Sequence, residues 1–425
     1  MNVLLLGSGG REHAFAYKLT QSKHCKQLFI APGNPGTAKH GINVNIKLND
    51  FEELGKFCMQ QNISLLIVGP EEPLVNGIRD FFEADKNLAD IKFIGPGKLG
   101  AQLEGSKDFS KDFMIKYKIP TANYKTFTSE NLHDGMEYVK KHSLPVVLKA
   151  DGLAAGKGVL ILNDNEVAVN EIRAMIENKK FGNASDKVVV EEYLNGIELS
   201  VFVLSDGTNY KILPTAKDYK RIGENDSGLN TGGMGAVSPV PFADEAYLKK
   251  VDERIIKPTI EGLKNENINY VGFIFIGLMS VNGEPFVIEY NCRMGDPETE
   301  VVLPLIKSDL LEMLVACADG KLDEYELLID DLAAATVMLV SAGYPGDYEK
   351  GKQIIGIDDI QNSQLFHAGT QLNENGELCT NGGRVMTITS FGKNINEAVS
   401  VSINNAKLIQ YEGKYFRKDI GFEFL

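Results

Sequence analysis

Apolar and polar positions alternate with two different periods along residues 1–100. Short apolar runs bounded by turn residues predict buried strands, and the run Arg11–Leu19 has the spacing of a helix. Strands that alternate with helices form a parallel sheet with helices on both faces. Ligands bind such a sheet at the carboxyl ends of its strands, where this chain has turns rich in glycine and proline at 7–11, 32–36 and 69–73. The predicted strands are Val3–Leu6, Gln27–Ile30, Leu65–Val68 and Ile91–Ile94.

The middle of the chain predicts a small α/β lobe and then an antiparallel hairpin. An amphipathic helix through Phe113 and Met114 leads into the lobe. Residues 214–241 have no regular period and are predicted as a long loop, which in a compact domain is usually functional or disordered. The other predicted elements are strands at Pro145–Leu148, Val159–Leu162, Lys187–Val190, Gly272–Ser280 and Pro285–Tyr290, a helix at Ala243–Lys264 and a hairpin turn at Asn282-Gly283.

The composition of the chain changes after about residue 325. Strands are predicted at Ala333–Val340, at Gly383–Ser390 and near Tyr415, and a helix at Asn394–Ile409. The predicted fold is therefore α/β and α+β with several domains. These are a parallel-sheet, Rossmann-like substrate domain at 1–103, a two-lobed domain at 104–325 and a small α+β domain at 326–425.

Composition and charge exclude several kinds of partner. The 425 residues are 43% hydrophobic and 24% charged, which is typical of a globular protein. The formal net charge of −14 argues against bulk binding to nucleic acid or to an anionic membrane. The start of the chain lacks a basic signal-peptide region, and no apolar run of about 18 residues occurs. Five cysteines without a CxxC pair predict reduced thiols, so we expect a cytoplasmic protein without nucleic-acid or membrane partners.

The segment Phe286–Glu300, FVIEYNCRMGDPETE, is the strongest candidate for a metal site. Side chains alternate along a strand, so Glu289, Asn291 and Arg293 share one face. Carboxylate and amide oxygens suit Mg²⁺, which completes its shell with water and substrate phosphates. Glu289 and Asn291 are therefore the predicted metal ligands, and the alternative is an edge strand with solvated polar residues.

Asp296 and Pro297 follow in the same segment. An acidic residue before proline is typical of a helix start, so Asp296 is predicted as an N-cap with Pro297 in the first helical position.

The turn Gly7-Ser8-Gly9-Gly10-Arg11 departs from the dinucleotide-binding fingerprint. Gly7 and Gly9 fit the pattern G-x-G-x-x-G, but Glu12 stands where the third small residue belongs, which argues against nicotinamide binding. A glycine-rich turn that opens a helix can still hold a phosphate group, with Arg11 in the first helical turn. Gly9, Gly10 and Arg11 are therefore candidate substrate ligands, unless glycine serves only the backbone angles of a tight turn.

A second glycine-rich segment joins two predicted strands between Lys149 and Val159. Its backbone N–H groups can close over phosphates, but its spacing is not that of a Walker A motif. The alternative is a surface hairpin loop without a ligand. The candidate nucleotide ligands in and near this flap are Lys107, Lys149, Asp151, Gly152, Gly156, Lys157 and Gly158.

Two further stretches are suited to small anionic ligands. The strand Lys187–Val190 leaves the lobe and forms a crevice for a purine ring, where Glu198 can bind ribose hydroxyls. Basic residues at 217–221 and the cluster Asn230-Thr231-Gly232-Gly233-Met234-Gly235 favour anion binding in the predicted loop.

The order of these stretches resembles the ATP-grasp ligases, and within them the family of phosphoribosylamine–glycine ligases, also called glycinamide ribonucleotide synthetases. The resemblance runs from end to end, and the ordered series is far more specific than any single glycine motif. The motifs that carry it are GSGGREHA at 7–14, PGNPG at 32–36, VGPEEPL at 68–74, AQLEGSKDFSKDFM at 101–114, LKADGLAAGKGV at 148–159, NTGGMGAVSP at 230–239, EYNCRMGDPETE at 289–300, AGYPGDY at 342–348, FHAGT at 366–370 and TNGGRV at 380–385.

The resemblance implies that residues 104–325 are an ATP-grasp domain whose lobe 121–192 is a mobile lid over ATP. It implies that ATP phosphorylates glycine and that the amine of 5-phosphoribosylamine then displaces phosphate, giving glycinamide ribonucleotide for purine biosynthesis. Mg²⁺ or Mn²⁺ is the implied metal, and we expect a monomer. The resemblance places adenosine at Glu191, Tyr193, Leu194 and Glu198, and the ribose phosphate near Gly9, Gly10 and Arg11.

Arg293 is the candidate for the glycine carboxylate, because a fixed guanidinium binds a carboxylate through two parallel hydrogen bonds. Asp218 and Asp296 are further candidate substrate contacts. Three positions depart from the family pattern, which has His at Tyr219, Pro at Leu229 and Phe at Met294. The alternatives are another ATP-grasp carboxylate–amine ligase or a catalytically silent nucleotide-binding protein.

Overall fold

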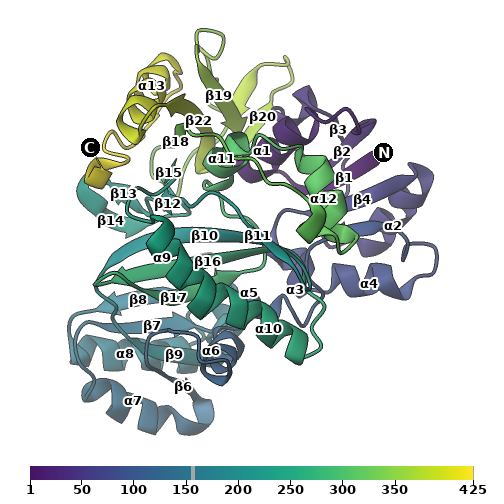
Figure 1. Cartoon of the computed structure of the whole chain (residues 1–425). Helices are drawn as coiled ribbons and strands as arrows, with labels where there is room; N and C mark the ends of the chain where they lie inside the picture. The colour runs from purple at the N-terminus through teal and green to yellow at the C-terminus, as the bar shows by residue number, and fades with distance from the viewer. Residues whose placement is uncertain (155–157, 425) are drawn as a thin grey trace.

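Four sheets of four or five strands form the body of the molecule in the computed structural model, which describes residues 1–154 and 158–424 (Figure 1). The first sheet lies on the right of the view and the second, in the lid lobe, at the bottom. The third crosses the middle, and the fourth lies at the top beneath the C-terminal helix. The predicted multidomain α/β and α+β fold is confirmed.

The N-terminal sheet is parallel throughout, with the strand order β3-β2-β1-β4-β5. In β1, Leu4 and Leu6 pack in one hydrophobic cluster and Val3 and Leu5 in another, so both faces are covered. Burial on both faces explains why these strands read as continuous apolar runs. The elements are β1 (Asn2–Gly7), α1 (Gly10–Leu19), β2 (Gln27–Pro32), β3 (Ile42–Asn43), α2 (Phe51–Gln60), β4 (Ile63–Val68), α3 (Glu71–Val75), α4 (Ile78–Ala84) and β5 (Lys92–Ile94).

The lid lobe is an antiparallel sheet of order β6-β9-β7-β8 with two helices against it. Phe127, Leu148, Ile172 and Val190 form its separate hydrophobic core. The lobe comprises β6 (Tyr124–Thr128), α7 (Leu132–Lys140), β7 (Val146–Ala150), β8 (Val159–Leu162), α8 (Asn165–Glu177) and β9 (Lys187–Glu192), and α5 (Gln102–Gly105) and α6 (Lys107–Lys116) precede it.

The central sheet has the order β11-β10-β16-β17, from β10 (Ile197–Asp206), β11 (Tyr210–Ile212), β16 (Val271–Val281) and β17 (Glu284–Asn291). The predicted hairpin turn is confirmed: Asn282 has φ 52° and Gly283 φ 78°, as a two-residue turn between twisted strands requires. The helix predicted at 243–264 is α9 (Glu245–Val251) and α10 (Lys257–Asn265), joined by a π-helical turn and lying diagonally across the sheet in Figure 1.

The fourth sheet corrects the prediction that residues 214–241 form a loop. Its order is β12-β15-β18-β22-β19, so β15 (Gly235–Ser238) pairs with the distant β18 and in turn with the edge strand β12 (Lys217–Asp218). A short strand that is stabilised by a distant strand need not show a clear alternation of apolar and polar residues in its own sequence. Between them, β13 (Arg221–Gly223) and β14 (Ser227–Asn230) form a small exposed hairpin. The remaining elements are α11 (Thr299–Val302), α12 (Leu310–Ala318), β18 (Ala333–Val340), β19 (Ser363–His367), β20 (Thr370–Leu372), β21 (Leu378–Thr380), β22 (Arg384–Gly392) and α13 (Ile395–Leu408).

The strand predicted near Tyr415 is also wrong. Tyr415 forms a single bridge to Val340 at the end of β18, which is too short to be a strand. An exposed aromatic residue in a short run gave the strand signal, but the chain leaves the sheet after one pair of hydrogen bonds.

A cluster of histidines joins the N-terminal domain to the C-terminal one. His13 in α1 accepts a hydrogen bond at Nδ1 from the backbone N–H of His367, at 2.7 Å. The rings of His40 and His367 lie 5.3 and 5.5 Å from that of His13. Burial lowers the pKa of His13 well below its usual range and lowers that of His367 to about 4.

Because these pKa values are lower in the folded chain, the unfolded chain binds more protons at mildly acidic pH. Stability should therefore fall as the pH falls from about 6.5 to about 4, by up to about 3 kcal/mol for His367 alone. Denaturation midpoints measured across this range should show a shallower slope for His367→Gln than for the unmodified chain. An unchanged slope would contradict the assignment.

Candidate active site

A cleft of about 430 Å³ lies where the domains meet, a volume typical of small-molecule sites. Its walls come from residues as far apart in the sequence as Arg11 and Arg384. Twelve of the predicted site residues line it: Arg11, Lys107, Lys149, Gly158, Glu191, Asp218, Thr231, Gly232, Glu289, Asn291, Arg293 and Asp296.

Strand β17 positions the predicted metal ligands. The pairing with β16 shifts between Leu278, which lies opposite Val287, and Gly277, which lies opposite Glu289. Val287 and Tyr290 pack in the core, while Glu289 and Asn291 line the cleft. The predicted sharing of one face by these two residues therefore agrees with the geometry, although a register shift precedes them.

Two oxygen-bearing side chains at this face are available to a ligand. In the described part of the chain, the Glu289 carboxylate forms no hydrogen bond or ion pair, and the buried Nδ2 of Asn291 has no partner. A buried donor without a partner is costly, so this N–H group is consistent with an acceptor oxygen of a bound group, while Oδ1 is the atom of Asn291 that can ligate a cation. Glu289 and Asn291 fit a hard divalent cation by donor chemistry and by position.

Buried lysines stand on the lid side of the cleft. Lys149 in β7 lies 2.9 Å from Glu191 Oε2 and donates to the carbonyl of Ile288 at 3.2 Å. Lys111 lies 3.2 Å from the other oxygen of Glu191, and its burial lowers its pKa to about 8 although Glu191 opposes this. Lys107 donates to the Gly152 carbonyl at 3.2 Å. These lysines, two of which pair with Glu191, line the cleft together with Glu289 and Asn291.

The flap segment is tied to the start of α6. Asp151 accepts hydrogen bonds from the Ser106 hydroxyl at 3.1 Å and from the Asp108 N–H at 2.8 Å. Asp151 thus fixes the end of β7 to the helix that carries Lys107. The predicted ligands Gly156 and Lys157 lie outside the described residues.

The predicted adenosine residues divide into two groups. Glu191 lines the cleft, whereas Tyr193, Leu194 and Glu198 lie beyond its lining. Tyr193 is exposed, and Glu198 forms an ion pair with Lys220. Burial alone would raise the pKa of Glu198, but Lys220 lowers it below its usual value.

Arg293 is held by protein carboxylates. Its Nε lies 3.1 Å from Glu71 Oε2 and its Nη2 lies 2.6 Å from Glu104 Oε1. Burial raises the pKa of Glu71, but Arg293 and Arg11 overcome this and lower it to about 2. The guanidinium is therefore fixed by two partners, and only its remaining donors can face a substrate.

Asp296 is not the N-cap of α11, which begins three residues later at Thr299. Its Oδ2 instead accepts from the backbone N–H of Arg11 at the start of α1, and its Oδ1 lies 3.0 Å from Arg384 Nη2. The N-terminus of any helix carries partial positive charge, so a carboxylate is favoured at the start of α1 for the same reason that it was predicted at the start of α11. The prediction failed because the helix that Asp296 serves is distant in sequence.

Gly9 and Gly10 lie behind this contact and outside the lining of the cleft. A Cβ on Gly9 would come 3.0 Å from Asp296 Oδ2, and one on Gly10 would come 2.3 Å from Glu300 Oε1. Both glycines thus allow α1 to approach the segment that follows β17.

Thr231 and Gly232 are the members of the 230–235 cluster that line the cleft. Asn230 is exposed in β14, and Met234 is buried against Met338 and Val340. A Cβ on Gly233 would come 2.5 Å from Pro297 Cδ, and one on Gly235 would come 2.5 Å from the Thr336 carbonyl oxygen.

Several charged residues of the cleft were missed from the sequence. Arg384 in β22 donates to the carbonyls of Gly232 and Asp296, both at 2.7 Å. Arg384 lies within the motif TNGGRV. Its position as a charged residue inside a family motif could have indicated a residue of the site. The missed residues are Glu71, Glu104, Lys111, Glu298 and Arg384, whereas Lys220 belongs to the basic run 217–221 that was predicted to favour anion binding.

The three departures from the family pattern lie away from the lining. The Tyr219 hydroxyl donates to Glu423 at 2.7 Å, and its ring lies under Arg417. Leu229 is exposed on the β13–β14 hairpin, and Met294 is buried in the core.

Comparisons with known proteins place the chain in one family. Family models for the N, ATP-grasp (A) and C domains of phosphoribosylglycinamide synthetase match residues 1–104, 105–299 and 334–423. The phosphoribosylamine–glycine ligase of Clostridium acetobutylicum is 46% identical over 99% of both chains, and that of Haemophilus influenzae is 45% identical over 99% of this chain and 98% of its own. The crystal structure of the Thermotoga maritima phosphoribosylamine–glycine ligase has a TM-score of 0.85 at 34% identity, covering 99% of this chain and 100% of that one.

The two-lobed sheets and the charged cleft between them define an ATP-grasp protein. The chain belongs to the phosphoribosylglycinamide synthetase family, as its sequence motifs indicated. Among the helices of the described residues, none has the length and apolar character needed to cross a membrane.

Proposed function

We propose that this chain joins glycine to 5-phosphoribosylamine with ATP, through glycyl phosphate, and releases glycinamide ribonucleotide, ADP and phosphate for purine biosynthesis. One observation carries the proposal: Glu289 and Asn291 of β17 line the same cleft as the half-buried Lys107 and the buried Lys149, and among the described residues the Glu289 carboxylate has no hydrogen bond or ion pair. Phosphoryl transfer depends mainly on positioning and charge neutralisation, and this arrangement supplies both. The relatives named phosphoribosylamine–glycine ligase support the choice of substrates.

Glu289 and Asn291 would hold the Mg²⁺ or Mn²⁺ that neutralises the phosphates of ATP. Lys107 and Lys149, which line the same cleft, would add positive charge for those phosphates. The flap would close over them and keep water from the acyl phosphate. The proposed flap and adenosine residues are Asp151, Gly152, Gly156, Lys157, Gly158, Glu191, Tyr193, Leu194 and Glu198.

The acceptor would bind at the opposite end of the cleft, near the start of α1. Arg11 faces this end and is the proposed contact of the ribose phosphate, beside Gly9 and Gly10. Arg293 remains the proposed contact of the glycine carboxylate, with Asp218, Asp296 and the 230–235 cluster as further contacts. We also propose three domains, at 1–103, 104–325 and 326–425, with a lid at 121–192. The same proposal includes a monomeric state and a cytoplasmic location.

Phosphate release from ATP with Mg²⁺ tests the function directly. We expect release only when glycine and freshly generated 5-phosphoribosylamine are both present. Release with other carboxylates but not with glycine would retain the fold and overturn the substrate. Bound ATP without any release would contradict the proposed catalysis.

A further inference from the structure

Glu298 is a charged residue of the cleft that the proposed chemistry does not yet use. It lies in the turn before α11, is 4% exposed and lines the cleft. Among residues 1–154 and 158–424, no other residue forms a hydrogen bond or ion pair with its carboxyl group, which meets only its own backbone N–H. A carboxyl that is buried, unpartnered and directed into a ligand cleft requires an explanation.

The position of this carboxyl is fixed by the backbone beside it. A Cβ on Gly295 would come 2.3 Å from Glu298 Oε2, so the carboxyl lies directly against the Gly295 backbone. Gly295 also lines the cleft. A larger side chain at position 295 would displace the carboxyl of Glu298.

The charged groups around Glu298 come from both ends of the cleft. Asp218 and Lys220 lie on the side of the nucleotide lysines and the metal face, and Arg293 and Arg384 lie on the side of Arg11. Glu300, which is fully buried, also lies near. Glu298 thus stands between the proposed nucleotide and acceptor ends, where the two substrates must meet.

Two neighbours are less suited to exchange a proton. Lys220 forms ion pairs with Glu198 and Asp218, and these carboxylates raise its pKa well above the usual value although burial opposes them. Burial raises the pKa of Asp218 as well, but its carboxylate is ion-paired with Lys220 at 3.2 Å. Burial, followed by the charge of Asp218, raises the pKa of Glu298 to about 8. A proton acceptor is most effective when its pKa lies near the working pH.

We propose that Glu298 accepts the proton of the attacking amine during amide formation, an inference that rests on the proposed function. The amine nitrogen forms a bond to the acyl carbon of glycyl phosphate, and the bond from that carbon to the phosphate oxygen breaks. The electron pair of the broken bond leaves with phosphate. One N–H proton passes to the Glu298 carboxylate, which later returns it to the released phosphate or to water.

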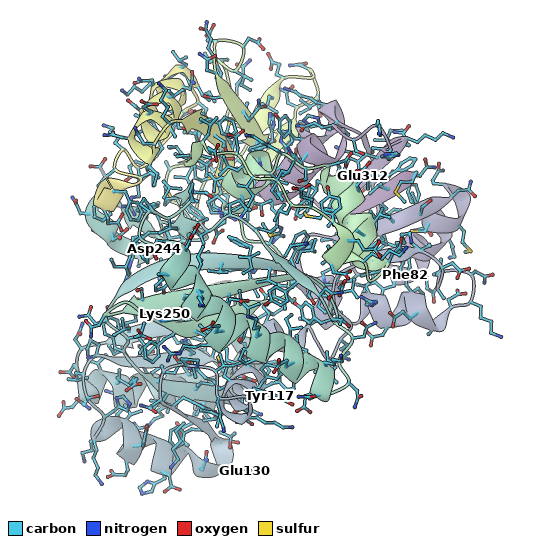
Figure 2. The ribbon with its side chains drawn as sticks, in the orientation of Figure 1. Phe82, Tyr117, Glu130, Asp244, Lys250 and Glu312 are labelled. Carbon is cyan, nitrogen blue, oxygen red and sulfur yellow. The ribbon has the colours of Figure 1, made fainter. Side chains whose placement is uncertain are left out.

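The decisive variant is Glu298→Gln, which keeps the shape of the side chain and removes the acceptor. Ligation should fall at least about 100-fold. Glycine-dependent exchange of the β,γ-bridging oxygen of ATP, which reports glycyl phosphate formation alone, should stay within about threefold of the unmodified enzyme, because Glu298 acts only after that step. Glu130→Gln is the matched control, since Glu130 is exposed at the lower end of the lid lobe, far from the cleft (Figure 2).

The pH profile gives a second readout that a structural role would not change. The ligation rate of the unmodified enzyme should rise with pH as the Glu298 carboxyl loses its proton, and this rise should be absent from Glu298→Gln and retained by Glu298→Asp. Gly295→Ala should show the same loss as Glu298→Gln, because it displaces the carboxyl.

The possible outcomes distinguish failure of the proposed role of Glu298 from failure of the proposed ligase function. Unchanged ligation and an unchanged pH profile in Glu298→Gln would overturn the role of Glu298 alone. Equal loss of ligation and of oxygen exchange would assign the residue to the first step or to the fold, and would also overturn the inference. Absence of glycine-dependent exchange and ligation in the unmodified enzyme would overturn the proposed function itself.

Discussion

Replacement of Glu289 by alanine should lower the ligation rate by roughly 1000-fold or more and leave the fold intact. Loss of one preorganised electrostatic contact to a reacting group commonly lowers a rate by about 100- to 1000-fold, and a metal ligand contributes at least as much. The fold should persist because the Glu289 carboxylate forms no ion pair or hydrogen bond in the described part of the chain. Ligation rates over a titration of Mg²⁺, together with the thermal midpoint, measure both effects.

Glu284→Ala is the matched control because Glu284 begins the same strand. Its carboxylate pairs with Lys250 and Arg254 on the surface, where solvent screens the charges and such pairs add little to stability. This control should keep full activity. Near-normal activity of Glu289→Ala at low Mg²⁺ would contradict the assignment of the metal ligand.

Arg293→Met should lower the free energy of unfolding by about 3 to 5 kcal/mol, because it removes the cation from the buried carboxylate of Glu104 and the half-buried one of Glu71. Glu71 and Glu104 would then remain close together without their shared partner, and the pKa of Glu71 would rise from about 2. The double variant Arg293→Met with Glu104→Gln should recover part of the loss. Chemical denaturation midpoints and slopes provide the measurement.

Arg254→Met makes the same chemical change at an exposed ion pair. It should lower the free energy of unfolding by about 1 kcal/mol or less. An equal effect of the two substitutions would show that the pairs of Arg293 contribute no more than a surface contact.

Elements formed by residues close together in the sequence were predicted correctly, because the residue patterns that indicate them lie within the same segment. The β16–β17 hairpin was predictable from two apolar runs and the pair Asn282-Gly283, and the parallel sheet from alternating strand and helix periods. Glu289 and Asn291 could be assigned because strand alternation sets their direction. The resemblance to a known family then supplied the substrates.

The missed features depend on partners far along the chain. Glu71 and Glu104 lie 222 and 189 positions from Arg293 in the sequence. The spacing of apolar and polar residues within one segment cannot predict a contact between segments so far apart. Strand β15 is completed by the distant β18, and Asp296 accepts a hydrogen bond from Arg11, at the start of a helix 285 positions earlier. Sequence patterns therefore identified the segments of the site more reliably than the contacts among them.

The mixed origin of the fourth sheet limits how the protein can be divided. Strands β12 and β15 occur early, yet β15 pairs along its whole length with β18. A chain cut before β18 would leave the unpaired edge of β15, with buried residues such as Val237, open to other chains. Such a fragment should aggregate on expression, and engineered fusions or reporters should be inserted at exposed turns rather than between the second and third domains.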